Sequence, residues 1–123
     1  MSKEQFLKEN LRDGEIYAGL ILGENGAPDH HVFLLSWNPK ERMKWSAAMK
    51  AAKKTGGSLP TRREQSLLFA NAKAHFEATW YWSCEEYAPG SRYAWGQYFV
   101  NGSQNANDKD YAGRARAVRR LYI

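Results

Sequence analysis

Leu59-Pro60-Thr61-Arg62-Arg63-Glu64 is the strongest helix-start signal in the chain. Thr61 precedes Glu64 by three residues. This is the spacing of a capping box, in which the two side chains satisfy free N–H groups at the start of a helix. The segment therefore predicts a helix over about residues 62–74. Its apolar residues recur at helical spacing, at Leu67, Leu68, Phe69, Ala72 and Phe76.

The residues before this segment predict a second amphipathic helix. Asn38-Pro39 would end a preceding strand, and Gly56-Gly57 would end the helix. The apolar stripe of this helix, at positions i, i+3, i+4 and i+7, consists of Trp45, Ala48, Met49 and Ala52. Four lysines lie largely off that stripe and form a basic patch, Lys44, Lys50, Lys53 and Lys54.

Further toward the N-terminus, two β-prone runs predict a hairpin. Residues 16–22 and 31–37 are rich in strand-forming residues, and a turn-rich stretch separates them. Both runs are apolar nearly throughout, so we expect the hairpin in the interior of a sheet. Before it, Ser2 and Gln5 have the spacing of another capping box, and Gly14 is placed to stop a short helix.

After residue 80 the chain changes to short aromatic-rich strands and turns. We expect strands at residues 80–83, 93–100 and 115–122, separated by Pro89-Gly90 and by residues 101–113. The length suits one domain, and no linker-like composition interrupts it. We therefore expect a single α+β domain over residues 1–123, with a helix in 1–14, the hairpin and two helices in 15–79, and a β-rich part in 80–123.

Composition limits the class of protein. With 43% hydrophobic and 14% aromatic residues, the chain must bury a core. Its single cysteine, Cys84, allows no intrachain disulfide and gives no sign of an oxidising compartment. The start of the chain lacks the pattern of a signal peptide, and no apolar run approaches the ~20 residues of a membrane span. We therefore expect a cytoplasmic protein with no membrane contact.

The net charge of +5 is concentrated in the middle of the chain. Residues 1–35 carry a net charge of −3, residues 36–75 carry +7, and residues 76–123 carry +1. The central block could meet the phosphates of nucleic acid or an acidic protein. A solvated helix face is the commoner meaning of such a run of lysines.

No segment has the pattern of a catalytic or metal site. His30 and His31 alternate to opposite faces of a strand, which disfavours a shared metal ion. Cys84 has no histidine near it in the sequence, so an inert thiol is expected. Glu85 and Glu86 alternate likewise, and no glycine pair belongs to a phosphate-binding loop. We expect no catalytic residue, no metal and no cofactor.

The region from Tyr93 to Tyr111 has the composition of a binding loop. Tyrosine supplies amphipathic contact area with little entropy to lose, and Asn, Ser, Gly and Asp supply adaptable hydrogen bonds. A polar hairpin whose Asn and Asp residues only make turns is the simpler interpretation. As a ligand-binding surface, the region would use Tyr93, Tyr98, Val100, Asn101, Ser103, Asn105, Asn107, Asp108, Asp110 and Tyr111.

Arginines near the C-terminus are a further charged group. On a strand, Arg114, Arg116 and Arg120 would project to one side. They could grip an anionic ligand or pair with Glu85, Glu86 and the two aspartates, and we favour the structural role. For the core, we expect the inward-facing side chains of Trp45, Leu68, Trp82 and Trp95.

Several short motifs follow one another in a fixed order. They are Gly57 to Glu64, Tyr81-Trp82-Ser83, Tyr93-Ala94-Trp95 with Tyr98-Phe99 and Gly102, and Arg116-Ala117-Val118-Arg119. Their order resembles the family named after the C-terminal domain of a collagen-like bacterial adhesin, over about residues 15–120. That family is similar to the C-type-lectin-like modules related to formylglycine-generating enzyme. This implies two main helices packed on a twisted, mostly antiparallel sheet with irregular ligand-binding loops.

Two departures limit what the resemblance implies. The enzyme relatives depend on a pair of cysteines, and this chain has only Cys84, so no oxidase activity is implied. The adhesin relatives bind sulfated polysaccharides, but this chain has no collagen repeats. Its short form resembles phage and prophage proteins, which would place it in a bacterial host cell or a phage particle. Residues 98–111 resemble the variable regions of diversity-generating retroelement targets, in which mutated asparagine codons yield Asn, Ser, Asp, Tyr, Gly, Ala and Val.

Three functional hypotheses follow. The leading one is a non-enzymatic binding protein of phage or prophage type, which presents its C-terminal surface to a protein or glycan ligand. The alternative is an intracellular accessory protein, or an inhibitor of a host defence complex, which binds nucleic acid or an acidic protein through the basic patch. The third is a degenerate relative of an enzyme. The sequence leaves a homo-oligomer open.

Overall fold

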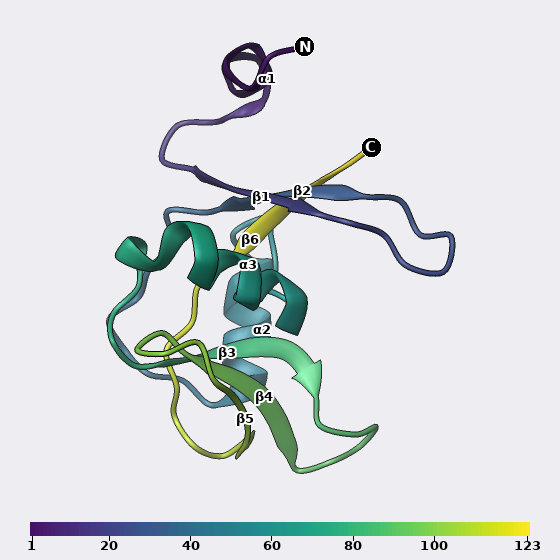
Figure 1. Ribbon diagram of the computed structural model, residues 1–123. Coiled ribbons are helices and arrows are strands. Elements are labelled where there is room, and N and C mark those ends of the chain that lie inside the picture. Colours follow the sequence, from purple (N-terminus) through teal and green to yellow (C-terminus); the bar gives the residue numbers. More distant parts are fainter.

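A computed structural model describes residues 1–123 as three α-helices and two small antiparallel sheets (Figure 1). The expected α+β class is confirmed. None of the helices has the length and apolar character needed to cross a lipid bilayer. Along the chain, the elements are α1 (Lys3–Asn10), β1 (Ile16–Ile21), β2 (His30–Leu34), α2 (Trp45–Lys53), α3 (Arg62–Ala72), the 3-10 turn η1 (Lys73–His75), β3 (Trp80–Glu86), β4 (Tyr93–Tyr98), β5 (Gln104–Asp108) and β6 (Val118–Tyr122).

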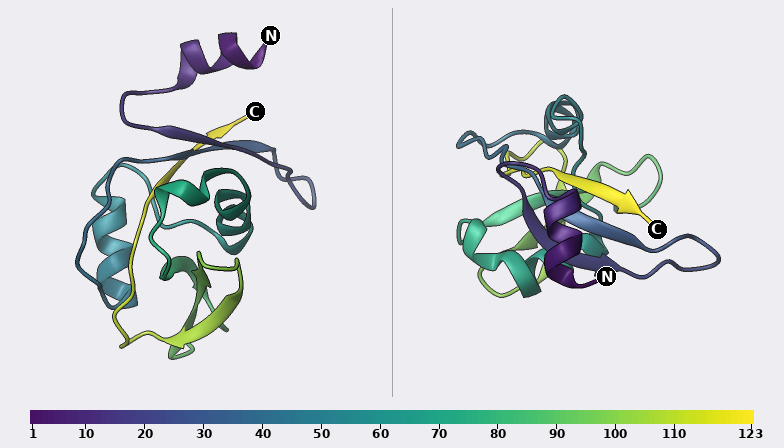
Figure 2. Two further views of the ribbon diagram at one scale, coloured as in Figure 1. Left: turned by 60° about the vertical axis from the view of Figure 1, so that its left-hand side comes forward. Right: turned by 90° about the horizontal axis from the view of Figure 1, so that it is seen from above.

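Helix α3 begins where the capping box places it. The Thr61 hydroxyl accepts a hydrogen bond from the Glu64 N–H, and the Glu64 carboxylate accepts one from the Thr61 N–H. The helix ends at Ala72 rather than near residue 74, because the chain tightens there into η1. Figure 2 shows α3 between the first sheet and the β3–β5 sheet, with α1 on the opposite face of the first sheet.

The first sheet has the strand order β1-β2-β6, so β2 is its central strand. The three last residues of β2, Val32, Phe33 and Leu34, are fully buried. The expectation of a wholly interior hairpin is wrong for β1, where Leu20 is 38% exposed. The reason is that β6, which comes from the far end of the chain, takes the other side of β2 and leaves β1 at the edge.

Glycine allows β1 to lie close to α3. The register of β1 on β2 shifts between Tyr17 and Gly19, and Gly19 has a φ of +127°. A Cβ atom there would stand 3.2 Å from side-chain atoms of Leu67 and Asn71. The Asn71 amide also donates to the Ala18 carbonyl at 2.6 Å, so helix and strand are joined by both packing and a hydrogen bond.

Two hydrophobic clusters form the core. One lies between the first sheet and α3, and it includes Leu68 together with Tyr81 and Phe99 from the second sheet region. The other contains the apolar face of α2, with Trp82 as its largest side chain. Leu68 and Trp82 are fully buried as expected, and the remaining two expected core residues are half-buried, Trp45 and Trp95.

The second sheet has the order β3-β4-β5, and β5 is a strand that the sequence does not predict. Its residues 104–108 include Asn and Asp, which favour turns over strands. They nevertheless pair with β4 from Tyr93↔Asp108 to Gln97↔Gln104. The pairing of β5 with β4, whose Gln97 is fully buried, therefore outweighs the low strand propensity of the β5 residues.

Helix α1 is shorter than expected and covers part of the outer face of the first sheet. The Ser2 hydroxyl caps it by accepting from the Gln5 N–H, but the helix ends at Asn10, before Gly14. Its Phe6 ring lies 4.2 Å from the His31 ring and holds the helix on the sheet. Gly14 belongs instead to the turn into β1, where its φ is +80°.

The C-terminal arginines are structural, but their partners differ from those expected. Arg120 pairs with Glu64 at 2.7 Å. Pairing of these arginines with Glu85 or Glu86 is wrong. Arg120 lies on β6 of the first sheet, away from β3, and Arg114, although it bridges to Tyr81 of β3, donates to the Asn38 side chain. Arg116 precedes β6 and is buried. It donates to three backbone carbonyls, those of Leu35, Trp37 and His75.

Trp82 generates a prediction about stability. Its side chain is fully buried, and its indole N–H donates to the Met43 carbonyl at 2.8 Å. We expect Trp82→Ala to lower the free energy of unfolding by about 3–5 kcal/mol through loss of burial and creation of a cavity. Leu22→Ala, at a site 61% exposed, should change it by less than about 0.5 kcal/mol. Urea denaturation measures both, and equal stability of Trp82→Ala and wild type would contradict the packing.

Candidate functional site

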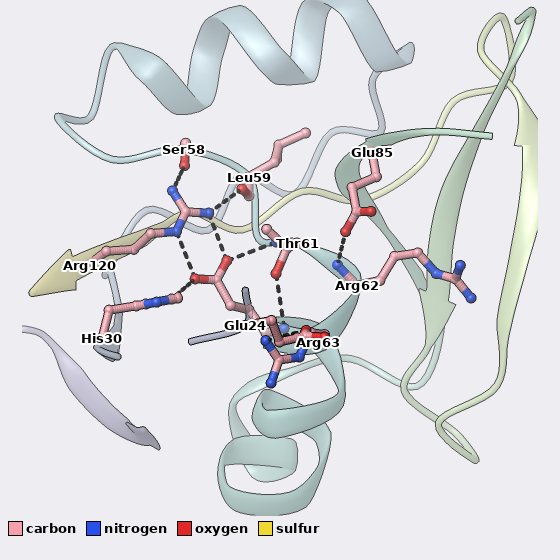
Figure 3. Close-up of polar contacts among 10 residues, drawn as sticks. Glu24, His30, Ser58, Leu59, Thr61, Arg62, Arg63, Glu85 and Arg120 are labelled. Atoms are coloured by element: carbon pink, nitrogen blue, oxygen red, sulfur yellow. Dashed lines mark hydrogen bonds and ion pairs between the residues drawn. The ribbon is translucent and has the colours of Figure 1, made fainter. Parts of the chain in front are cut away.

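The first turn of α3 brings together residues from both sheets (Figure 3). The Arg62 N–H donates to the Glu85 carboxylate of β3, with an N···O distance of 2.7 Å. The Arg62 side chain points away from Arg120 and His30, toward the second sheet (Figure 3). Side chains of the same helical turn therefore point toward two different sheets.

On the side of the first sheet, Glu64 is a fully buried carboxylate that forms three hydrogen bonds with two side chains. Arg120 donates to both of its oxygens at 2.7 Å, and Nε2 of His30 lies 2.7 Å from Oε2. Burial alone would raise the pKa of this carboxyl. The hydrogen bonds and charge of Arg120, with the Thr61 N–H, outweigh burial, so the pKa lies below its ordinary value. This ion pair joins α3 to β2 and β6.

On the other side, a polar pocket of about 560 Å³ opens beside the turn. In it, the Arg62 guanidinium stacks 3.5 Å above the Trp95 ring, and its Nε–H donates to the Gln104 amide oxygen at 2.9 Å. The two terminal nitrogens of Arg62 have no partner within the protein. The lining residues are Ile21, His30, Thr61, Arg62, Arg63, Ser66, Glu85 and Gln104.

A smaller apolar hollow adjoins this pocket. It has a volume of about 350 Å³ and is lined by Tyr87, Tyr93 and Ala106. The Tyr87 ring lies 5.6 Å from that of Trp95, which carries the Arg62 guanidinium on its face. The hollow and the pocket are therefore neighbours on one face of the second sheet.

Most residues predicted to bind a ligand are exposed, but they do not share one face. Strand alternation places Tyr98 and Asn105 on one face of the β4–β5 ribbon and Tyr93 and Asp108 on the other. The turn at residues 99–103 and the pair at 110–111 flank opposite ends of β5. The exposed members are Tyr93, Tyr98, Val100, Asn101, Ser103, Asn105, Asp110 and Tyr111.

The other two predicted residues are half-buried and make contacts within the protein. Asp108 pairs with Arg92 at 2.7 Å and accepts a hydrogen bond from the Asp110 N–H at 2.9 Å. The Asp110 N–H, followed by Arg92, lowers the pKa of the Asp108 carboxyl. Asn107 donates to the Asn105 carbonyl at 3.2 Å. Asp108 therefore has a structural role in shaping the loop after β5.

The basic patch lies on and beside α2. All four of its lysines are exposed and none takes part in an ion pair: Lys44, Lys50, Lys53 and Lys54. Two of them, Lys50 and Lys53, lie in the last turn of the helix. Positive charge is favourable there because the helix dipole places partial negative charge at that end. Helix stability alone can thus account for part of the patch.

The groups with catalytic potential have structural surroundings. Burial raises the pKa of the Cys84 thiol to about 11, so the thiol is protonated at neutral pH. Glu85 accepts the Arg62 N–H, and Glu86 pairs with Lys109 at 2.7 Å. No group of three or more His, Cys, Asp and Glu side chains is arranged to hold a metal ion.

The sequence alone does not predict the polar pocket. It indicates a helix start at Arg62 and a core residue at Trp95, and none of Arg62, Trp95 and Gln104 is among the predicted ligand-binding residues. These residues come from α3, β4 and β5, so they meet only after the sheet has formed. No spacing or periodicity along the chain could have linked them.

Comparison of the chain with models of known protein families and with curated proteins finds no match. The resemblance to C-type-lectin-like modules therefore stays a hypothesis drawn from the motifs.

The buried ion pair predicts how stability depends on pH. We expect Glu64→Gln to lower the free energy of unfolding at neutral pH by about 3–5 kcal/mol, because Arg120 would lose its carboxylate partner. The lowered pKa of Glu64 means that its contribution is complete above the carboxyl pKa of the unfolded chain. That contribution is lost as the pH falls through the folded pKa.

Urea denaturation at neutral pH and at about pH 3 tests this, with the exposed Glu41→Gln as the matched control. Glu64→Gln should lose less stability on acidification than wild type and Glu41→Gln. An equal acid-induced loss in all three proteins would contradict the role of Glu64.

Proposed function

We propose that the protein is a non-enzymatic binding protein, which presents the β4–β5 hairpin and its adjoining loop to a macromolecular partner, a protein or a glycan. The observation that carries the proposal is the exposure of large side chains along this hairpin. Tyr98 is 39% exposed, Val100 54% and Tyr111 63%. Exposed tyrosines supply much of the contact area of binding surfaces at little entropic cost.

Side chains between these exposed positions hold the hairpin in place. Phe99 is buried, and its ring stacks 3.9 Å from that of Phe76. The Gln104 amide donates to the Arg62 carbonyl at 2.8 Å and to Gln97 at 2.9 Å. A surface whose scaffold is already ordered loses little further entropy on binding, which favours affinity.

This alternation also supports an origin in a phage or prophage protein diversified by a retroelement. Gln104 and Lys109 help to fix the hairpin, and neither residue type can arise by adenine mutagenesis of an asparagine codon. The exposed positions between them hold residue types that can. Diversification of this kind would change the surface and spare the scaffold.

A fivefold alanine variant tests the proposal. The replaced side chains are exposed and make no hydrogen bond within the protein, namely Tyr98, Val100, Ser103, Asn105 and Tyr111. We expect its free energy of unfolding in urea to stay within about 1 kcal/mol of wild type, since exposed side chains contribute little to stability. It should no longer bind the ligands that wild type binds on a glycan array or selects from a display library of random peptides.

A control variant carries alanines at exposed sites of the first sheet, Leu20, Leu22 and Tyr122, and should keep those ligands. Unfolding of the fivefold variant would show that the hairpin is structural. Retention of the ligands by that variant, or no ligand for wild type on either probe, would count against the proposed surface.

One observation favours the alternative function, an accessory protein or inhibitor of a host defence complex. The four lysines of the basic patch are exposed and have no acidic partner within the protein. Unpaired cations on one helix are suited to phosphates or to an acidic protein surface.

A salt titration tests the nucleic-acid form of this alternative. If the patch binds nucleic acid, affinity for labelled single-stranded and duplex DNA should fall steeply from low to physiological salt, because binding releases counterions. The double substitution Lys50→Glu with Lys53→Glu should abolish this binding. The matched control, Lys3→Glu with Lys8→Glu on α1, makes the same change of charge away from the patch and should not abolish it. Fluorescence anisotropy measures the affinity. No binding at low salt would exclude this form of the alternative.

A further inference from the structure

The edge of β5 is bonded to the rest of the protein only at the end of the strand. Four strands lie at an edge, β1, β3, β5 and β6. The Asn71 side chain donates to a carbonyl of β1, Ser58 bridges to β6, and the Pro60 carbonyl accepts an N–H of β3. Strand β5 pairs with β4 alone, and on its other side the only backbone hydrogen bond is at its last residue, where the Tyr111 N–H donates to the Asp108 carbonyl.

The hydrogen-bond pattern shows which groups face outward from this edge. The Tyr98 N–H of β4 donates to the Ser103 carbonyl at 2.9 Å. Hydrogen-bonded pairs alternate along an antiparallel ladder, so Asn105 also bonds to β4 while its neighbours Gln104 and Ala106 do not. The backbone N–H and C=O groups of Gln104 and Ala106 therefore point away from the sheet, without partners. Such an edge is a template for a further strand.

Two recesses lie on one face of this sheet, and each of them is lined by one residue of β5. The polar pocket adjoins Gln104 and contains the free terminal nitrogens of Arg62, and the apolar hollow is lined by Ala106 with Tyr87 and Tyr93. Gln104 and Ala106 are two residues apart on one face of β5. This separation, about 6.7 Å, is also that between successive side chains on one face of any added strand.

Charge indicates what the polar pocket would accept. The Arg62 guanidinium is held by the Trp95 ring and by Gln104, so it is already oriented. The acidic residue of the pocket, Glu85, is bound to the Arg62 N–H. A carboxylate can take both terminal nitrogens of an arginine in two parallel hydrogen bonds.

We propose that the free edge of β5 docks an extended segment of a partner protein, which adds to the second sheet as a fourth strand. The segment places an acidic side chain at Arg62 and, two residues away, an apolar or aromatic side chain in the hollow of Tyr87, Tyr93 and Ala106. Main-chain hydrogen bonds to Gln104 and Ala106 supply affinity, and the two recesses supply specificity. This inference rests on the proposed function and specifies its partner as a protein segment.

A display library of random twelve-residue peptides, selected on the full chain, tests the inference. Enriched peptides should carry Asp or Glu two residues from an apolar or aromatic residue. Ala106→Pro removes the outward N–H and leaves the bonds to β4, a change that edge strands tolerate. This substitution should lower the affinity for the selected peptides about tenfold. Arg62→Gln should lower the affinity for acidic peptides about tenfold or more. Arg12→Gln, which removes the same charge from an exposed arginine outside both recesses, is the matched control and should have little effect.

Amide hydrogen exchange gives a second measurement that does not depend on a variant. In the free protein, the amides of Gln104 and Ala106 should exchange fast and that of Asn105 slowly. Addition of a selected peptide should slow exchange at Ala106. If Ala106→Pro fails to fold, peptides methylated on alternate backbone nitrogens replace it, and only one of the two methylation patterns should abolish binding.

The outcomes separate this inference from the proposed function. Peptides that bind wild type and Ala106→Pro equally, but not the fivefold alanine variant, would overturn strand addition and leave the binding surface in place. Slow exchange of the Ala106 amide in the free protein, or no enrichment of acidic peptides, would also overturn strand addition.

Discussion

The pairing of Glu64 with Arg120 is the constraint on which the rest of the structure depends. A fully buried carboxylate without partners would be very costly, so α3 can only lie where β6 and β2 bring Arg120 and His30 to it. The pair connects the middle of the chain to its last strand. Because Glu64 is thereby fixed toward the first sheet, Arg62 is fixed toward the second.

Contacts on the opposite side of α3 are amide hydrogen bonds rather than charges. The Gln65 side chain donates to the Tyr81 carbonyl at 3.0 Å, and the Gln97 side chain donates to the Gln65 carbonyl at 2.6 Å. Both glutamine side chains are buried, and such bonds are satisfied in only one register of helix against sheet. Helix α3 is thus held by directional polar contacts on both sides, with apolar packing between them.

These contacts explain how a strand of poor propensity can present a binding edge. Gln97 anchors β4 to α3, and Gln104 of β5 is bonded to Gln97 and to the first turn of the helix. The hairpin is consequently fixed from beneath, while its outward backbone groups and its tyrosines have no partner in the protein. The same strand is therefore rigid and still has unpaired backbone groups. The proposed recognition surface requires both properties.

Features that depend on near neighbours can be predicted from the chain alone. The N-cap at Ser2, the capping box at Thr61, the stripe of α2 and the burial of Trp82 follow from helical spacing and side-chain size, which act within a few residues. Three features appear only in the folded protein: the existence of β5, the pairing of Arg120 with Glu64 rather than with a glutamate of β3, and the pocket at Arg62. Each of these depends on which strands pair. Pairing is set by the free energy of burying distant segments together, and no local pattern in the chain records it.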